Sequence, residues 1–258
     1  IVLNVRFGVP GGGARAYEPG SEGTLWWGRY DDKARKLGIT SLLDSCSATK
    51  TCPKIVETLG SAEFWGLRAS PNFVGTDAKS DIPLPANVRR YYFPSVTHGG
   101  SFVGGFQTKG ETSPYSAQGC VLGGNPNPSR ESTRVALHAL VNWVKADKEP
   151  PASRYPTLAS GELVAPTAAA MGWPDIPGAP KPDGKLYTFH DYDFGRGYDA
   201  KTVSGAPKLQ PPRIRRTLPS RVPRVNADGN ETSGVPSVQL QVPLGTYTGF
   251  NELAAGYG

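Results

Sequence analysis

The chain has 258 residues, of which 38% are hydrophobic, which suffices for one large domain with a substantial buried core. No run reaches the ~18 consecutive apolar residues of a membrane span, so we expect no such span. The 32 glycines and 25 prolines argue against a helical bundle and predict many loops and short elements.

The formal charge is +6, and much of the excess lies in one proline-rich segment. Its arginines are Arg213, Arg215, Arg216, Arg221 and Arg224, interleaved with Pro211, Pro212, Pro219 and Pro223. Prolines at this density exclude a basic recognition helix. No RNA-binding motif or zinc-ligand spacing accompanies them. We therefore expect a solvated, proline-stiffened loop and no nucleic-acid partner.

Two of the three cysteines, Cys46 and Cys52, lie six positions apart in a turn-prone segment. This spacing favours a local disulfide in an exported protein, extracellular or periplasmic, over two free thiols in a cytosolic loop. Cys120 is then free or paired outside the chain. Too few cysteines are present for a zinc site made of four of them, and we predict no metal and no cofactor.

The amino-terminal residues 1–7 are typical of a β-strand, with no initiator Met and no signal peptide. We therefore expect a fragment or a processed subunit. The glycine-rich stretch 10–23 is not a phosphate-binding loop, because no Lys-Ser/Thr follows it. Residues 25–43 begin with aromatic residues and continue as a mixed-charge stretch that predicts a helix to about Leu37.

Two strands and a long helix follow. Residues 54–59 and 87–93 have the composition of buried strands, and the residues between 64 and 85 are mostly loop. Ser129 is a good N-cap for a helix over 130–146. Its apolar stripe is expected at Leu137, Leu140, Val141 and Val144.

The composition changes at residue 150. Prolines and glycines become frequent, and short β-like runs occur only at 186–189 and 237–243. We expect a core over residues 1–149, and an irregular Pro/Gly-rich extension over 150–258 packed on the same domain.

An acidic residue and a histidine follow the two predicted strands in the order of a catalytic triad. Glu63 comes four residues after the strand 54–59, and His98 follows the strand 87–93 in Thr-His-Gly-Gly. The carboxyl ends of parallel strands meet at one edge of a sheet. A carboxylate there can orient an imidazole, which can then take a proton from a hydroxyl nucleophile. The long helix closes the pattern.

Several runs carry a resemblance to a known family. They are Ser-Ala-Glu-Phe-Trp-Gly-Leu-Arg-Ala-Ser at 61–70, Leu-Pro-Ala-Asn-Val-Arg-Arg-Tyr at 84–91, Thr-His-Gly at 97–99, Pro-Ala-Ser-Arg-Tyr-Pro at 151–156, Asp-Tyr-Asp-Phe-Gly at 191–195, Asp-Gly-Asn-Glu at 228–231 and Val-Pro-Leu-Gly-Thr-Tyr-Thr-Gly at 242–249. With them the chain resembles exported α/β-hydrolase-domain proteins of a poorly characterised family, nearly end to end. The resemblance implies an α/β fold, the carboxy-terminal part of an α/β-hydrolase with a mostly parallel sheet and flanking helices. It also implies carboxylic-ester hydrolysis, without naming the ester.

In such proteins the G-x-S-x-G nucleophile elbow precedes the acid. Here Gly99-Gly100-Ser101-Phe102-Val103 lacks the final glycine and follows His98. The resemblance therefore implies a nucleophile serine outside the given chain, in a missing amino-terminal segment, so that this chain alone is expected to be inactive.

The acid of the triad has rivals. Glu63 leads, Asp77 is the main alternative, and Asp81 lies in the same loop. The structural alternative for Glu63 is a salt bridge with Arg68. Candidates for lining a substrate pocket are Phe64, Trp65, Gly99 and Gly100, although core packing is as good an explanation for the two aromatic residues.

Three further features have weaker interpretations. His138 is interpreted as a surface or packing residue of the helix. His190 with Asp191 and Asp193 is a weak metal pattern. Asn230-Glu231-Thr232 fits an N-glycosylation sequon.

Two functions of different class follow. The first is a serine esterase acting through an acyl-enzyme, with His98 as base and then acid and Glu63 as orienting carboxylate. Its substrate is a small-molecule or polymeric ester. The second is a non-catalytic hydrolase-like binding or structural module.

Overall fold

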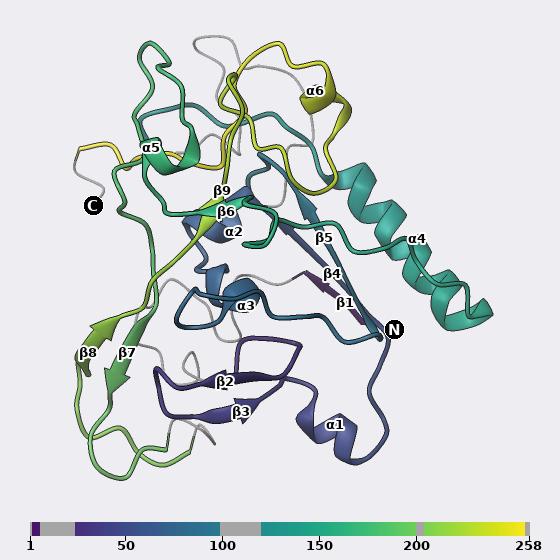
Figure 1. The fold of residues 1–258 in the computed structure, drawn as a ribbon, viewed down its shortest axis with the longest axis vertical. Coiled ribbons are helices and arrows are strands. Elements are labelled where there is room, and N and C mark those ends of the chain that lie inside the picture. The colour runs from purple at the N-terminus through teal and green to yellow at the C-terminus, as the bar shows by residue number, and fades with distance from the viewer. Residues whose placement is uncertain (1, 6–23, 99–119, 200–203, 256–258) are drawn as a thin grey trace.

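The structure, a computed structural model, describes residues 2–5, 24–98, 120–199 and 204–255 (Figure 1). The strands are β1 (Val2–Val5), β2 (Tyr30–Asp32), β3 (Gly38–Thr40), β4 (Ile55–Gly60), β5 (Val88–Phe93), β6 (Leu163–Val164), β7 (His190–Asp193), β8 (Arg213–Thr217) and β9 (Val222–Pro223). The helices are α1 (Asp44–Ala48), α2 (Ser61–Trp65), α3 (Ser70–Val74), α4 (Arg130–Ala146), α5 (Ala168–Met171) and α6 (Val238–Gln241). No described helix is long and apolar enough to cross a membrane.

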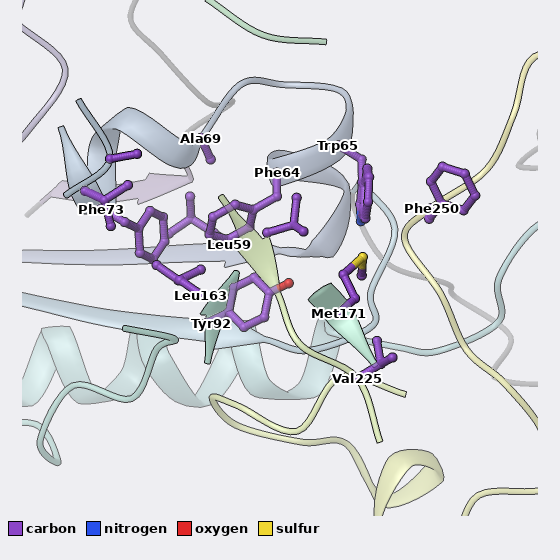
Figure 2. Packing of buried hydrophobic residues seen from close by; sticks show 13 residues of the cluster. Leu59, Phe64, Trp65, Ala69, Phe73, Tyr92, Leu163, Met171, Val225 and Phe250 are labelled. Atoms are coloured by element: carbon purple, nitrogen blue, oxygen red, sulfur yellow. The ribbon is translucent and has the colours of Figure 1, made fainter. Parts of the chain in front are cut away.

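The central sheet has the order β1-β4-β5, and both strand pairs are parallel. Neighbouring side chains of a strand point to opposite faces. Tyr91 and Phe93 of β5 accordingly pack with Leu140 of α4, whereas Tyr92 packs with Phe64 of α2 on the other face. The larger of these two clusters also receives residues from the second half of the chain, such as Met171 and Val225 (Figure 2). The sheet is thus covered by helices on both faces, as the α/β prediction requires.

The long helix begins and ends where it was predicted, but its buried face differs. Ala136, Leu140 and Trp143 face the sheet, whereas Leu137 and Val144 are 40% and 43% exposed. The predicted stripe was right at Leu140 and wrong at Leu137 and Val144, because it counted aliphatic residues only. The indole of Trp143 fills more of the interface than Val144 could, and the small Ala136 lets the helix lie close to the strands.

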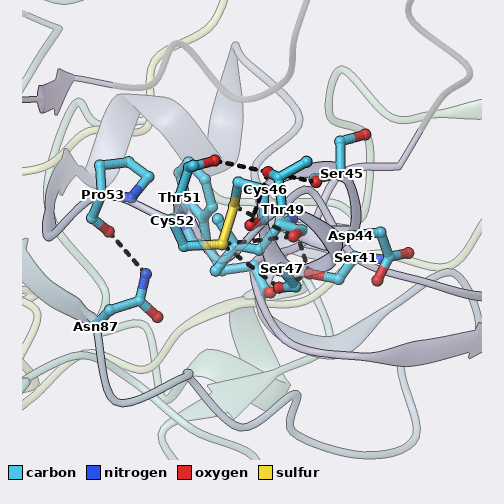
Figure 3. The surroundings of a disulfide bond; sticks show 12 residues. Ser41, Asp44, Ser45, Cys46, Ser47, Thr49, Thr51, Cys52, Pro53 and Asn87 are labelled. Carbon is cyan, nitrogen blue, oxygen red and sulfur yellow. Dashed lines mark hydrogen bonds between the residues drawn. A yellow bond between two sulfur atoms is a disulfide. The ribbon is translucent and has the colours of Figure 1, made fainter.

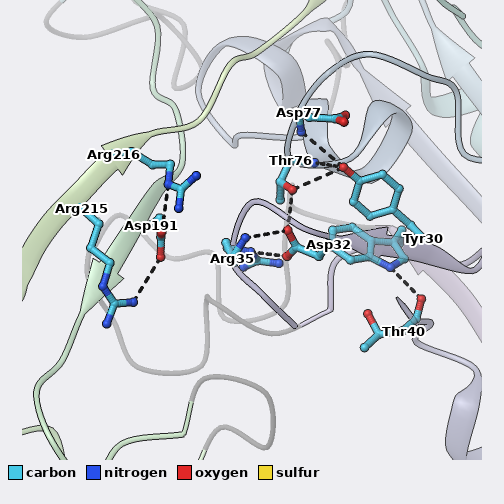
Figure 4. Close-up of polar contacts among 10 residues, drawn as sticks. Tyr30, Asp32, Arg35, Thr40, Thr76, Asp77, Asp191, Arg215 and Arg216 are labelled. Atoms are coloured by element: carbon cyan, nitrogen blue, oxygen red, sulfur yellow. Dashed lines mark hydrogen bonds and ion pairs between the residues drawn. The ribbon is translucent and has the colours of Figure 1, made fainter. Parts of the chain in front are cut away.

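The predicted helix within residues 25–37 is wrong, because this region forms the antiparallel pair β2–β3. The turn between them uses positive φ angles at Lys36 (59°) and Gly38 (72°). Asp32 is fully buried and accepts hydrogen bonds from the Arg35 side chain and from Thr76 Oγ1 at 2.6 Å (Figure 4).

Other local expectations also need correction. The stretch 64–85 is mostly loop, as predicted, although it contains the short helix α3. The run 237–243 contains α6 instead of a strand, and the Ser237 hydroxyl caps its first turn. The β-like run 186–189 precedes the strand β7 instead of forming it. The first part of the expected arginine-rich loop, with Arg213, Arg215 and Arg216, is in fact strand β8, which pairs with β7. All five residues of β8 are exposed, as the expected solvation requires.

Residues from the second half of the chain cover the outer edge of β5. The Arg154 backbone donates to Arg90 O and accepts from Tyr92 N, both at 2.9 Å, and Val235 N donates to Tyr92 O at 2.8 Å. An edge strand with unpaired N–H and C=O groups would invite pairing with another chain. This edge is instead occupied by the protein itself.

Candidate active site

The strands β4 and β5 end side by side, since Gly60 pairs with Phe93 in their parallel register. Helix α2 begins immediately after Gly60, and Ala62 N donates to Val96 O at 3.2 Å. The loop after β5 therefore lies against the first turn of α2. Residues that follow the two strands meet at one edge of the sheet.

Glu63 and His98 are in contact at this edge. His98 Nδ1 lies 2.9 Å from Glu63 Oε1, and Glu63 Oε2 accepts a hydrogen bond from Gly60 N at 2.6 Å. The Glu63 side chain is 5% exposed and that of His98 is 48% exposed. The hydrogen bond with Glu63 raises the pKa of His98 above its usual 6.5, and partial burial opposes the rise. A buried, fixed carboxylate thus orients an imidazole that reaches solvent.

The rival carboxylates are engaged elsewhere. Asp77 is exposed and accepts from Lys79 N at 3.1 Å, while Asp81 accepts from Leu158 N and Ala159 N. Arg68 does not bridge to Glu63. Its guanidinium stacks over the ring of Phe189, 4.6 Å from the centroid.

Phe64 and Trp65 are core residues. The Phe64 ring lies 4.8 Å from that of Phe73, and the Trp65 ring lies 4.9 Å from that of Phe250 (Figure 2). Both side chains are buried, so they anchor α2 on the hydrophobic core. Gly99, Gly100 and Ser101 lie outside the described residues.

A second buried carboxylate, Glu231, bonds residues that lie close to the pair in the sequence. It accepts hydrogen bonds from the Ser61 hydroxyl, from Tyr92 Oη at 2.6 Å and from Ser95 N at 2.6 Å. Burial raises the pKa of Glu231, and these hydrogen bonds oppose the rise. Sequence reasoning missed this residue, because its partners lie up to 170 positions away. The only signal was its place in Asp-Gly-Asn-Glu, one of the runs that carry the resemblance.

The comparison with known protein families agrees with this geometry. The family described as alpha/beta hydrolase domain matches residues 14–258. The chain belongs to this family. No curated protein and no solved structure matches the chain. The family match therefore points to hydrolysis as the class of reaction to consider for the Glu63–His98 pair.

The predicted cysteine pair is joined in the structure. Cys46 and Cys52 form a disulfide at α1 (Figure 3), with a Cα–Cα distance of 4.7 Å. Cys120 is free. The disulfide closes the segment that leads into β4. At its end, Asn87 Nδ2 donates to Pro53 O at 2.7 Å, which ties the starts of β4 and β5 together.

The other polar candidates have structural partners. His190 Nδ1 contacts Thr217 Oγ1, and Asp191 pairs with Arg215 and Arg216 (Figure 4). Among the described residues, no three His, Cys, Asp or Glu side chains cluster as metal ligands. His138 contacts Asn142 on the exposed face of α4.

The sequon asparagine is buried. Asn230 is 1% exposed, its Nδ2 donates to Gly245 O, and its Oδ1 accepts from Tyr247 N at 2.6 Å. In the folded chain this side chain is a structural residue.

Proposed function

We propose that the protein is a serine-type hydrolase of carboxylic esters that acts through an acyl-enzyme. The observation that carries the proposal is the contact between His98 Nδ1 and Glu63 Oε1 at the ends of adjacent parallel strands. The order of the pair, an acid followed by a histidine, is that of the α/β-hydrolase triad, which supports the proposal. It requires no cofactor.

In this mechanism neutral His98 takes the proton of a serine hydroxyl as the oxygen attacks the ester carbonyl carbon. Glu63 holds Nδ1–H in its hydrogen bond, so the other ring nitrogen accepts the proton, and the carboxylate stabilises the imidazolium. The proton then passes to the leaving alcohol as the C–O bond breaks. Water repeats the sequence on the acyl-enzyme, with His98 again as base, and releases the acid.

The serine is proposed to come from a segment outside the given chain. The 258 residues contain no G-x-S-x-G, and the serine precedes the acid in this family's order. Of the described serines before Glu63, Ser41 and those of α1 lie in the disulfide region, and Ser61 donates to Glu231. We further propose an exported protein, because a disulfide persists in oxidising compartments.

The test uses the protein extended to include the segment before Ile1. Wild-type protein is expected to hydrolyse p-nitrophenyl acetate and to be labelled by a fluorophosphonate. Glu63→Gln should reduce kcat by about 10³-fold or more, as in other triads that lose the orienting carboxylate. Asp77→Asn is the matched control and should leave kcat within about twofold, because Asp77 contacts a turn instead of the imidazole.

The same experiment distinguishes the second function. A folded, extended protein that neither reacts with the probe nor turns over esters would be a hydrolase-like binding module. Normal turnover in Glu63→Gln would overturn the assignment of the acid.

A further inference from the structure

Glu231 connects the two loops that carry the proposed catalytic pair. On one side its Oε1 accepts the hydroxyl of Ser61, the first residue of α2, two positions before Glu63. On the other side its Oε2 accepts the backbone N–H of Ser95, three positions before His98. One carboxylate therefore bridges the helix of the acid and the turn of the histidine.

Ser95 is the residue at which the chain turns toward Glu63. Its φ is +53°, a left-handed conformation that costs a non-glycine residue free energy and needs support from its surroundings. Its backbone N–H donates to Glu231, its hydroxyl accepts from Glu231 N at 2.9 Å, and its carbonyl accepts from Asn125 and Asn127. The turn before His98 is thus held from two sides, by Glu231 and by the two asparagines that precede α4.

The segment around Glu231 fits closely against both strands. A Cβ on Gly234 would lie 2.3 Å from Tyr92 O, and a Cβ on Gly249 would lie 2.2 Å from Ser61 Oγ. Tyr92 itself donates its hydroxyl to Glu231 Oε2. Glycine at these two positions lets the carboxy-terminal residues reach the carboxyl ends of β4 and β5.

From these contacts we infer that Glu231 is a positioning residue for the acid–histidine pair, acting through Ser61 and Ser95 without touching the substrate. The inference rests on the proposed function for its catalytic meaning. Its geometric content, that the Glu63–His98 contact depends on Glu231, is independent of the reaction.

The test measures the His98 pKa in the full chain by NMR of labelled histidine rings, with His98→Ala to assign the signal. In wild-type protein this pKa should exceed 6.5 because of Glu63. Glu231→Ala should lower it toward the value in Glu63→Gln, since the two loops lose their common acceptor. In the extended protein, kcat should fall on the order of 100-fold, the effect of misplacing a catalytic group by about 1 Å, with KM little changed.

Glu231→Gln is the conservative rescue. Its amide oxygen can accept from Tyr92 and Ser95 while its NH₂ donates to Ser61. We expect a His98 pKa and kcat near those of wild type. Glu57→Ala is the matched control. Glu57 is a buried carboxylate like Glu231, but it lies in β4 and accepts hydrogen bonds from Asn72 and Arg90. It should lower the melting temperature comparably and leave the His98 pKa unchanged.

An unchanged His98 pKa in folded Glu231→Ala would overturn the inference and leave the proposed function standing. If that variant does not fold, Ser95→Ala and Gly249→Ala disturb the two sides separately and should each lower the His98 pKa. An unchanged His98 pKa in both of these variants would also overturn the inference. An inactive wild-type protein with a normal response of the His98 pKa would instead refute the esterase and keep the positioning role.

Discussion

The end of the central sheet and the β7–β8 hairpin each hold a histidine near carboxylates. The two surroundings shift the histidine pKa in opposite directions. His98 meets Glu63, 35 residues away, and this hydrogen bond raises its pKa. His190 is followed directly by Asp191, yet burial lowers its pKa first and the charge of Arg68 lowers it further. The hairpin lies apart from the central sheet (Figure 1).

The difference follows from strand geometry. Adjacent residues of a strand point to opposite faces, so Asp191 turns away from His190 toward the arginines of β8. Residues that follow neighbouring parallel strands share an edge whatever their separation in sequence. Proximity in sequence is therefore a poor guide to a functional pair here.

The largest expected contrast is in activity. In the extended protein, His98→Ala should lower kcat for p-nitrophenyl acetate by at least about 10³-fold, because no group remains to move the proton. His190→Ala should leave kcat within about threefold, since His190 contacts only Thr217 among its described polar partners. Equal losses in the two variants would remove the functional distinction between the regions.

The buried charges of the sheet should matter more for stability than those of the hairpin. Glu57 and Arg90 are fully buried and paired across β4 and β5. Glu57→Ala should reduce the free energy of unfolding by about 3–5 kcal/mol, because Arg90 keeps an uncompensated buried charge. Urea unfolding at pH 7 measures this. A loss below about 1 kcal/mol would mean that water reaches Arg90.

The two histidines should make stability depend on pH with opposite signs. A folded-state pKa above 6.5 at His98 contributes stability that is present below pH 6.5 and lost as the pH rises through the folded pKa. The lowered pKa of His190 contributes stability that is present above pH 6.5 and lost as the pH falls. Urea unfolding of His98→Ala and His190→Ala at pH 5.5 and 8.5 should show these opposite trends. Parallel trends would refute the opposite pKa shifts of His98 and His190.

The smallest effect should come from the hairpin's ion pairs. The side chains of Arg215 and Arg216 are about half exposed, so water screens their attraction to Asp191. Arg216→Ala should cost about 1 kcal/mol or less of unfolding free energy, by the same urea assay. A cost near that of Glu57→Ala would show that the hairpin is as integral as the sheet.

Strong local patterns in the sequence predicted strands β4 and β5 and the contact between Glu63 and His98. The apolar runs before Gly60 and Pro94 gave β4 and β5, and their order with the helix at 130–146 indicated Glu63 and His98. The family match supports the same hydrolase fold. The roles of the two side chains in catalysis stay predictions.

Tertiary partners explain what the sequence did not show. The mixed charges of residues 30–40 suit a helix, but the burial of Asp32 against Arg35 and Thr76 favours a hairpin. Strand β8 exists because β7 lies beside it. The role of Glu231 can be recognised only from the structure, because Ser61, one of its partners, lies 170 positions away in the sequence.

The long separation between Ser95 and Glu231 has a consequence for biosynthesis. Glu231 leaves the ribosome 136 residues after Ser95, which takes roughly 7–27 s at the usual ~5–20 residues per second. During that time the turn before His98 lacks the two hydrogen bonds that its left-handed residue makes with Glu231. A nascent chain therefore carries both members of the pair well before Glu231 can bridge their loops.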